Sequence, residues 1–519
     1  MEKELANYSN AIELRGICKA FGTVVANKNI DLTVRKGEIL ALLGENGSGK
    51  TTLMNMLSGI YHPDSGSIFV YGHEVHIRSP QDAMALGIGM IHQHYKLVDN
   101  LTATENIILG TDTKRQAARA LSEKVRQISN RFGLEIEPDK KIYDMSVSEK
   151  QTVEIVKVLY RGANILVLDE PTAVLTPQET EKLFAILRRM KQDDCAVIII
   201  THKLNEVLEI SDRVAVLRKG ESIATVETAG CDINQLTELM VGRAVNLSID
   251  RPKTGKKTPI LEIVHLGVKN TDGIAALKDV NFDLRKGEIL GVAGIAGSGQ
   301  KELCEAVAGL HKVEEGAILY QKQNLVGKMP EEIIKLGISM SFVPEDRLGM
   351  GLVAAMGMTD NMILKSYREG KGFLVDRKPG RALAARLIRR LDIVTPDTET
   401  PVSRLSGGNV QKVLLGREIE SQPNVLITAY PVRGLDINSS YLIYNLLNEQ
   451  KAAGVAILYI GEDLDVLLEL CDRIMVLYDG KVQAILKAEE ATKEMLGLLM
   501  TGSQLKAEGG EMDATERNS

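Results

Sequence analysis

The stretch Gly44-Glu45-Asn46-Gly47-Ser48-Gly49-Lys50-Thr51 decides how the rest of the chain is interpreted. The apolar run Ile39–Leu43 before it predicts a buried strand, and residues 52–57 after it predict a helix. Strand, glycine-rich loop and helix in this order form the context of a phosphate-binding loop. Glycines let the backbone turn its N–H groups onto phosphate oxygens, and the helix N-terminus adds the positive end of its dipole. We expect Lys50 to reach the β- and γ-phosphates and Thr51 to offer its hydroxyl to Mg²⁺.

The composition is that of a globular protein. The 519 residues are enough for at least two domains, and 44% of them are hydrophobic and 25% charged. A net charge of −6 argues against a protein that coats nucleic acid. No run of 18 apolar residues occurs, and the N-terminus does not resemble a signal peptide. The five cysteines lack metal-binding spacing, so we expect reduced thiols in a cytosolic protein whose membrane role depends on partner chains.

The sequence contains two copies of one long unit. Lys36-Gly37-Glu38-Ile39-Leu40 recurs 250 residues later, and Asp212-Arg213 recurs 260 residues later as Asp472-Arg473. A period this long indicates fused domains rather than a solenoid. Apolar strand-like runs and helical stretches in each copy predict α/β domains with a largely parallel sheet. We expect a first domain (copy one) at 1–248, a linker at 249–259, a second domain (copy two) at 260–502 and a disordered tail at 503–519.

Two strands of copy one are expected to end in reactive side chains. The run Ile165-Leu166-Val167-Leu168 ends in Asp169-Glu170, and the run Ala196–Ile200 is followed by Thr201-His202. Sheets of this type bind ligands at the carboxyl ends of their strands. Asp169 is therefore placed to hold Mg²⁺ through water, and Glu170 to polarise an attacking water. His202 can touch the γ-phosphate from its strand end, although a lone histidine is usually structural.

Two further residues of copy one are weaker candidates. Gln93 offers an amide that could sense Mg²⁺ or water, and Phe21 precedes the phosphate loop and could stack on adenine. Ordinary core or loop roles remain the alternatives for both.

Copy two lacks the residue types that this chemistry needs. Its phosphate loop, Gly294-Ile295-Ala296-Gly297-Ser298-Gly299-Gln300-Lys301, has lost the phosphate-facing lysine and the hydroxyl ligand. Its acid pair is replaced by an alanine and a tyrosine, and no aromatic residue matches Phe21 near residues 270–272. We expect a site that does not hydrolyse nucleotide. The substituted positions are Gln300, Lys301, Ala429, Tyr430 and, in place of His202, Glu462.

Together these residues resemble the ATP-binding cassette family over nearly the whole chain, twice. The resemblance implies ATP and Mg²⁺ as cofactors. For each copy it implies a parallel-sheet core carrying the phosphate loop, an antiparallel β subdomain and a helical subdomain. Phe21 resembles the adenine-stacking aromatic, Gln93 the Q-loop residue and His202 the switch histidine. The implied catalytic residues are Glu170, His202 and Lys50, and the implied Mg²⁺ ligands are Thr51, Gln93 and Asp169. The implied ATP-binding positions are Phe21, Gly44, Glu45, Asn46, Gly47, Ser48, Gly49, Lys50, Thr51, Thr52, Gln93, Ser406, Gly407 and Gly408.

Nucleotide sites of that family are composite: the phosphate loop of one domain faces the Leu-Ser-Gly-Gly signature of another. Copy two has an intact signature, Leu405-Ser406-Gly407-Gly408-Asn409-Val410-Gln411-Lys412. The signature of copy one is degenerate, because Val147 and Ser148 follow Ser146 where the family has two glycines. The losses therefore fall on one composite site. The resemblance implies that the competent site combines the loop, acids and histidine of copy one with Ser406 and Gly408.

The decayed second copy, its Val343-Pro344-Glu345-Asp346-Arg347 stretch and its signature resemble the ATPases of bacterial simple-sugar importers, and residues 94–106 are similar to the nucleoside branch. The resemblance implies an ATP-hydrolysing subunit that couples energy to nucleoside import. Its partners would be two transmembrane permease subunits and an extracellular solute-binding lipoprotein. The subunit would be peripheral at the cytoplasmic face of the cell membrane, contact the membrane only through the permeases and bind no nucleic acid.

Three other functions stay open. They are the ATPase of a ribose/galactose-type importer, a soluble twin-cassette ATPase acting on ribosomes, and a regulatory nucleotide-binding module without turnover. The short linker and the decayed second site argue against the ribosomal protein. The intact set of Lys50, Asp169, Glu170 and His202 argues against a module without turnover.

Overall fold

The computed structural model describes residues 9–93, 95–111, 117–244, 247–252, 255, 258–270, 272–342, 347–367 and 374–503. The chain divides into two compact units, Met1–Leu247 and Ser248–Ser519, which contain copy one and copy two and are described separately. His94, residues 343–346, part of the expected linker and the expected tail beyond Ser503 lie outside the described residues.

The core sheet of unit 1 has the strand order β10-β9-β3-β8-β7-β6. All neighbours from β9 to β6 are parallel, and only the edge strand β10 is antiparallel. Its central strands are continuous apolar runs because both faces of the sheet are covered. The strands are β3 (Ile39–Leu43), β6 (Ile88–Ile91), β7 (Ile165–Asp169), β8 (Ala196–Ile200), β9 (Arg213–Arg218) and β10 (Glu221–Glu227).

One face of this sheet packs on an antiparallel subdomain and on the helix after the phosphate loop. Leu40 and Leu42 of β3 join a core with residues of this subdomain. The second sheet has the order β2-β1-β4-β5. Its strands are β1 (Asn10–Phe21), β2 (Val24–Arg35), β4 (Ser65–Val70) and β5 (His73–Val75), and the helices on this side are α2 (Lys50–Leu57) and α3 (Pro80–Ala85).

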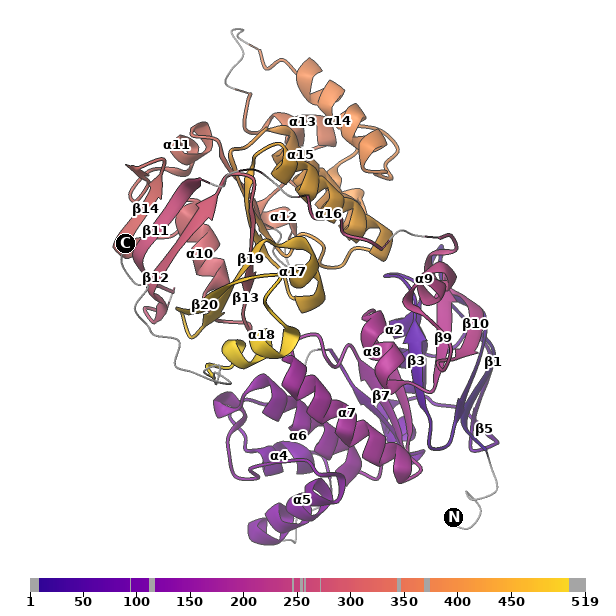
Figure 1. The fold of residues 1–519 in the computed structure, drawn as a ribbon. Helices are drawn as coiled ribbons and strands as arrows, with labels where there is room; N and C mark the ends of the chain where they lie inside the picture. Colours follow the sequence, from indigo (N-terminus) through magenta and orange to yellow (C-terminus); the bar gives the residue numbers. More distant parts are fainter. Residues whose placement is uncertain are drawn as a thin grey trace. The chain divides into compact units, whose positions relative to one another are not determined.

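The other face of the core sheet packs on helices. Ile39 of β3 joins this second core, and Figure 1 shows α4, α5 and α6 on the side of the sheet opposite β1 and β5. Ser146 begins α6 with a capping box, in which its side chain and that of Glu149 satisfy each other's backbone N–H groups. The helices are α4 (Ala103–Ile108), α5 (Ala118–Phe132), α6 (Val147–Tyr160), α7 (Pro177–Gln192), α8 (Leu204–Ile210) and α9 (Ile233–Val241), with a 3₁₀ turn at Ile142–Asp144.

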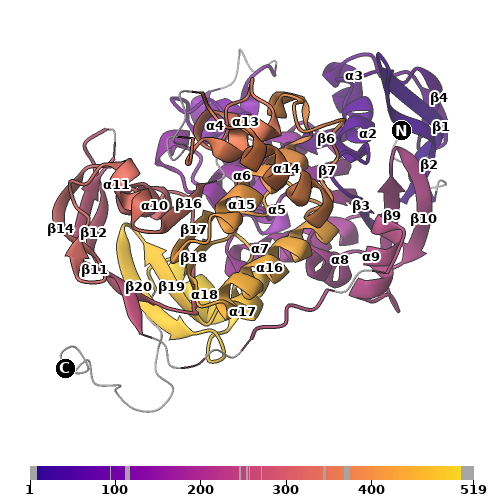
Figure 2. The ribbon, with the colours of Figure 1, turned by 90° about the horizontal axis from the view of Figure 1, so that it is seen from above.

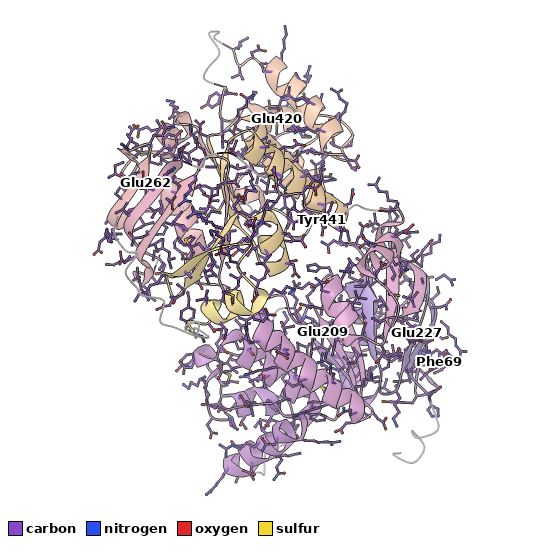
Figure 3. The ribbon with its side chains drawn as sticks, viewed as in Figure 1. Phe69, Glu209, Glu227, Glu262, Glu420 and Tyr441 are labelled. Carbon is purple, nitrogen blue, oxygen red and sulfur yellow. The ribbon has the colours of Figure 1, made fainter. Side chains whose placement is uncertain are left out.

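Unit 2 repeats this architecture. Its core sheet has the order β16-β17-β18-β13-β19-β20 and its antiparallel sheet the order β12-β11-β14-β15. Glu420, labelled in Figure 3, stands at the end of α15 (Gly407–Glu420). It pairs with Arg386 at 2.5 Å and Arg390 at 3.0 Å, which ties α14 (Lys378–Arg390) to α15. The strands are β11 (Pro259–Lys269), β12 (Ala275–Arg285), β13 (Ile289–Ala293), β14 (Val313–Tyr320), β15 (Gln323–Asn324), β16 (Ile338–Phe342), β17 (Val425–Ala429), β18 (Ala456–Ile460), β19 (Arg473–Tyr478) and β20 (Lys481–Lys487).

The helices of unit 2 correspond to those of unit 1 except for the short α12, which has no counterpart among the described residues of unit 1, and Figure 2 shows α13, α14 and α15 grouped beside the core strands. They are α10 (Gln300–Val307), α11 (Pro330–Lys335), α12 (Arg347–Met350), α13 (Met358–Ile363), α14 (Lys378–Arg390), α15 (Gly407–Glu420), α16 (Ile437–Ala452), α17 (Leu464–Leu470) and α18 (Lys493–Met500), with a 3₁₀ turn at Val402–Arg404.

The expected fold class is confirmed: two α/β domains, each with a largely parallel core sheet, an antiparallel subdomain and a helical subdomain. The helix expected at residues 52–57 begins two residues earlier, so Lys50 and Thr51 stand in the first turn of α2. Within the described part of the chain, no helix is both long and apolar enough to cross a bilayer.

Candidate nucleotide site

The phosphate loop joins β3 to α2. Gly49 precedes the helix with φ 97°, and a Cβ atom built on it would lie 2.3 Å from the carbonyl oxygen of Ala26. Only glycine fits that backbone conformation and that close approach. The side chain of Lys50 curls back along the loop, where Nζ donates to the carbonyl oxygens of Gly44 at 2.7 Å and Glu45 at 3.0 Å. The ammonium group therefore lies where the loop can present it to phosphate.

Lys50 is only 8% exposed. Burial lowers the pKa of its ammonium group, and the nearby carboxylates of Glu170, Asp169 and Glu45 act in the opposite direction. The structure thus brings the predicted lysine and the two predicted acids within electrostatic reach of one another. Because burial penalises the charged form of Lys50, a bound anion such as phosphate would stabilise its ammonium group.

The acid pair stands at the carboxyl end of β7. Glu170 adopts φ 51°, a left-handed conformation that costs a residue with a side chain about 1 kcal/mol or more. Its backbone N–H donates to the carbonyl oxygen of Ile200 at 2.9 Å, so the end of β7 is tied to the end of β8. His202 follows β8, and its Nδ1 donates to Oε1 of Glu170 at 2.9 Å. The strained turn places the carboxylate and the imidazole together.

The second carboxylate oxygen of Glu170, Oε2, is buried and has no hydrogen-bond partner among the described residues. An unpaired buried acceptor is costly, and a catalytic role is one explanation for such an atom. An attacking water would satisfy this oxygen. Next to it, burial and the charge of Glu170 raise the pKa of Asp169 to about 6, with Lys50 acting against them.

These residues suit a magnesium ion that binds mainly to phosphate. Among the residues that the structure describes, no three His, Cys, Asp or Glu side chains gather into a metal-binding group. Thr51 is exposed in the first turn of α2, and Asp169 offers a carboxylate at the same sheet edge. Magnesium often takes only one or two protein ligands beside phosphate oxygens and water. A cation there would also favour the ionised form of Asp169.

Gln93 and Phe21 lie on neighbouring elements. Gln93 is exposed, two residues beyond the end of β6, which places it at the same edge of the sheet as the acid pair. Phe21 ends β1 in the antiparallel subdomain and is 44% exposed. Its ring packs edge-on against Tyr61, with 5.1 Å between centroids. Sequence reasoning missed Tyr61, because only the fold brings this second aromatic ring beside the first.

The two signature helices begin differently. Ser406 Oγ accepts from the side-chain amide of Asn409 at 2.9 Å, and the first turn of α15 carries no acid. At the start of α6, the carboxylate of Glu149 accepts from the backbone N–H of Ser146 at 2.7 Å and pairs with Lys140 at 2.6 Å. The N-terminus of α6 in copy one is thus already paired with the carboxylate of Glu149. The intact end in copy two leaves its helix dipole available to an external anion.

The substituted positions of copy two keep the backbone but change the chemistry. Gln300 is buried, and its amide donates to the carbonyl oxygen of Ile295 at 3.2 Å, where Lys50 contacts Glu45 in copy one. Tyr430 repeats the left-handed turn with φ 51° and follows the buried Ala429. Burial raises the pKa of the Tyr430 hydroxyl to about 12. Lys301 is 65% exposed near Glu305, and Glu462 lies 3.7 Å from the guanidinium of Arg433.

Comparisons with known proteins agree with the two-copy architecture. The ABC transporter family model matches residues 27–173 and 277–431. The nucleoside import ATP-binding protein NupA of Lactococcus lactis subsp. cremoris is 42% identical over 95% of this chain and 98% of its own. The guanosine import ATP-binding protein NupO of Bacillus subtilis is 44% identical over 96% and 98%. The ribose import ATP-binding protein RbsA 1 of Streptomyces avermitilis is 37% identical over 97% and 96%. The family resemblance is confirmed: the chain belongs to the ABC transporter family, as an ATPase with two ATP-binding cassettes.

Proposed function

We propose that this chain is the ATP-hydrolysing, energy-coupling subunit of a bacterial importer whose solutes are nucleosides. The relatives named for nucleoside and guanosine import are 42% and 44% identical along almost the whole chain. A ribose importer subunit at 37% identity supports a ribose/galactose-type substrate as the second candidate. In this proposal the imported solute does not contact this chain, and the described site binds the phosphates of ATP.

The observation that carries the catalytic part is the pairing of Glu170 with His202 at 2.9 Å, beside Lys50 and Asp169. Glu170 Oε2 accepts a hydrogen bond from the attacking water, while His202 holds the other oxygen in place. Lys50 and the loop N–H groups balance the charge on the phosphates. Mg²⁺, held by Thr51, Gln93 and Asp169, would supply further positive charge when bound. Phe21 provides the apolar face for adenine.

We infer that Ser406, Gly407 and Gly408 of copy two complete this site at the γ-phosphate. The first turn of α15 carries no acid, and Ser406 accepts from Asn409, so the serine's own proton can be donated to an anion. The opposite combination is the degenerate site. Glu149 would repel a phosphate there, and neither Gln300 nor Tyr430 supplies the missing charge or base. Ser146 and Ser148 belong to that second site.

The partners follow from the same proposal. An importer ATPase acts on two transmembrane permease subunits and, through them, on an extracellular solute-binding lipoprotein. The chain would then be peripheral at the cytoplasmic face of the cell membrane, with its membrane contact made by the permeases. The net charge of −6 supports the absence of a nucleic-acid partner.

Phosphate release by two matched variants tests the catalytic assignment. Glu170→Gln should retain bound ATP and lower turnover by about 10²–10⁴-fold, because one positioned catalytic group is lost. Tyr430→Phe occupies the equivalent turn of copy two and should leave the rate unchanged. Equal losses in the two variants would contradict the assignment of hydrolysis to copy one.

Uptake by cells lacking this protein tests the transport assignment. Radiolabelled nucleoside uptake should be lost, and ribose and galactose uptake retained. Normal nucleoside uptake with lost ribose uptake would reverse the order of the two candidate solutes.

A further inference from the structure

The middle of α6 is attached to the loop that carries Glu170. Gln151 is buried, and its Nε2 donates to the carbonyl oxygen of Pro171 at 2.8 Å. Pro171 directly follows Glu170, so this hydrogen bond fixes the backbone immediately beyond the carboxylate. The bond is inside the protein, where losing the donor leaves a carbonyl oxygen unsatisfied.

Two further residues of α6 hold the segment that follows Gln93. The backbone N–H of Lys96 donates to Oε1 of Glu154 at 2.7 Å, and Nζ of Lys157 donates to the carbonyl oxygen of Lys96 at 3.2 Å. Glu154 and Lys157 also pair with each other at 2.9 Å, with side chains only 5% and 16% exposed. The backbone N–H and the carbonyl oxygen of Lys96 are therefore both hydrogen-bonded to side chains of α6. A buried ion pair is tolerated when such hydrogen bonds satisfy its remaining atoms.

Copy two shows which of these contacts is particular to copy one. Arg417 stands where Lys157 does and donates to the carbonyl oxygen of Gly351 at 2.9 Å, the position equivalent to Lys96. Gln411 repeats the contact of Gln151 by donating to Pro431. Leu414 replaces Glu154 and packs closely against Gly351. An acidic residue at the position of Glu154, whose carboxylate accepts from the N–H of Lys96, thus occurs only in copy one. Copy one is also the copy that has the amide of Gln93 and the carboxylate of Glu170.

We propose that Gln151, Glu154 and Lys157 are positioning residues for ATP hydrolysis. They lie three residues apart along α6, and one rigid helix thereby fixes the loop behind Glu170 and the loop behind Gln93. The N-terminus of α6 lacks the two glycines of an intact signature, and the middle of the helix has this positioning role. The inference rests on the proposed function of Glu170 and Gln93. Its physical reason is that a displacement of about 1 Å at a catalytic group costs on the order of 10²-fold in rate.

Steady-state ATPase rates and Mg-ATP affinity of the purified full-length chain test the proposal. Gln151→Leu and Glu154→Met should each lower kcat by about 10–10²-fold. Gln151→Leu should also leave the dissociation constant for Mg-ATP unchanged, because Lys50, the phosphate loop and the segment after Gln93 are untouched. Glu154→Gln keeps an acceptor for the N–H of Lys96 and should restore most of the rate. Val153→Ala removes buried apolar contact from the same helix; it should lower the melting temperature without changing kcat.

The outcomes separate this inference from the proposed function. Wild-type kcat in Gln151→Leu and Glu154→Met, or equal damage from Glu154→Gln and Glu154→Met, would overturn the positioning role. A loss of kcat in Val153→Ala as large as theirs would also overturn it, since general destabilisation would then be the cause. If Gln151→Leu fails to fold, the two Glu154 variants decide. Glu170→Gln in the same assay tests the proposed function itself, which fails if that variant turns over at the wild-type rate.

Discussion

At the residue scale, the two copies place different side chains on the same backbone. Glu170 and Tyr430 both adopt φ 51°, and each donates its N–H to the last residue of the neighbouring strand, Ile200 at 2.9 Å and Ile460 at 2.8 Å. Copy two therefore retains the strained turn without the carboxylate. The difference in chemistry between the copies lies in the side chains, because the turn that presents them is unchanged.

Lys50→Gln introduces the residue that copy two has at this position. Because Gln300 already holds a loop carbonyl through its amide, the loop should keep its shape and the melting temperature should change little. ATPase activity should fall by about 10²–10³-fold, since a charge that stabilises the transferring phosphate is lost. Phosphate release measures this. The control is Gln300→Lys, which should leave the rate as it is; a comparable loss from Gln300→Lys would contradict the asymmetry.

Asp169→Asn should stabilise the protein free of nucleotide and magnesium. The pKa of Asp169 is raised from 3.8 to about 6, so ionising this carboxyl costs more in the folded state than in the unfolded state. This cost is absent below about pH 4, grows as the pH rises through about 6 and is complete above it. Discounted for partial exposure, it amounts to about 1–2 kcal/mol, or a few degrees in melting temperature.

Thermal melts of both proteins in EDTA at pH 4 and pH 8 check the Asp169 prediction. The variant should melt higher than the wild type at pH 8 and at the same temperature at pH 4. A variant that melts lower at pH 8 would mean that the ionised carboxylate stabilises the fold through Lys50 more than burial penalises it.

At the element scale, the signature helices of the two copies begin with different residues. α15 begins with two glycines and no acid, whereas α6 begins with Val147 and Ser148 and carries Glu149 in its first turn. A helix N-terminus attracts anions, and a carboxylate in its own first turn competes with an external anion for that position. We therefore propose that the composition of the first turn sets which of the two helices can contact a nucleotide.

Gly408→Asp should lower the ATPase rate by about 10²-fold or more, because a carboxylate there would repel the γ-phosphate. Ser148→Asp should cost much less, since it would face only the decayed loop. ATPase rates of the two variants in the assembled transporter measure the difference. Greater damage from Ser148→Asp would contradict the assignment of Ser406 and Gly408 to the working site.

Gly408→Ala is the steric control for that comparison. A Cβ atom at Gly408 would approach Cδ2 of Leu435 to 3.3 Å, and the flexible end of that side chain can move by a few tenths of an ångström. We expect Gly408→Ala to fold normally and to retain far more activity than Gly408→Asp. The loss in Gly408→Asp can then be attributed to charge.

At the scale of the whole molecule, each unit has two hydrophobic cores of its own, one on each face of its core sheet. A unit that contains its own cores can fold alone. We expect residues 1–247, expressed separately, to bind ATP and to hydrolyse it slowly, because Ser406 and Gly408 are missing. Adding residues 248–519 should raise the rate. An isolated first unit with full activity would exclude any part of copy two from the working site.

The sequence by itself determined the fold class, the duplication and the substitution of the predicted nucleotide-site residues in copy two. The phosphate loop can be predicted from the sequence because its motif lies within eight consecutive residues. The strand before it and the helix after it are also predicted by their own residue patterns. The acid pair can be predicted because it directly follows an apolar run. Features that depend only on neighbouring residues, such as a loop conformation or a strand end, can therefore be predicted from the sequence.

Only the tertiary structure decided which side chains meet. His202 contacts Glu170 although 32 residues separate them, because β8 lies between β3 and β7 in the sheet. The contacts of Phe21 with Tyr61, and of Glu154 with Lys96 across 58 residues, have no sequence signal either. The order of parallel strands differs from their order in the chain. Contacts at the sheet edge, and the helix that supports them, therefore follow from topology and packing, which no local stretch of residues encodes.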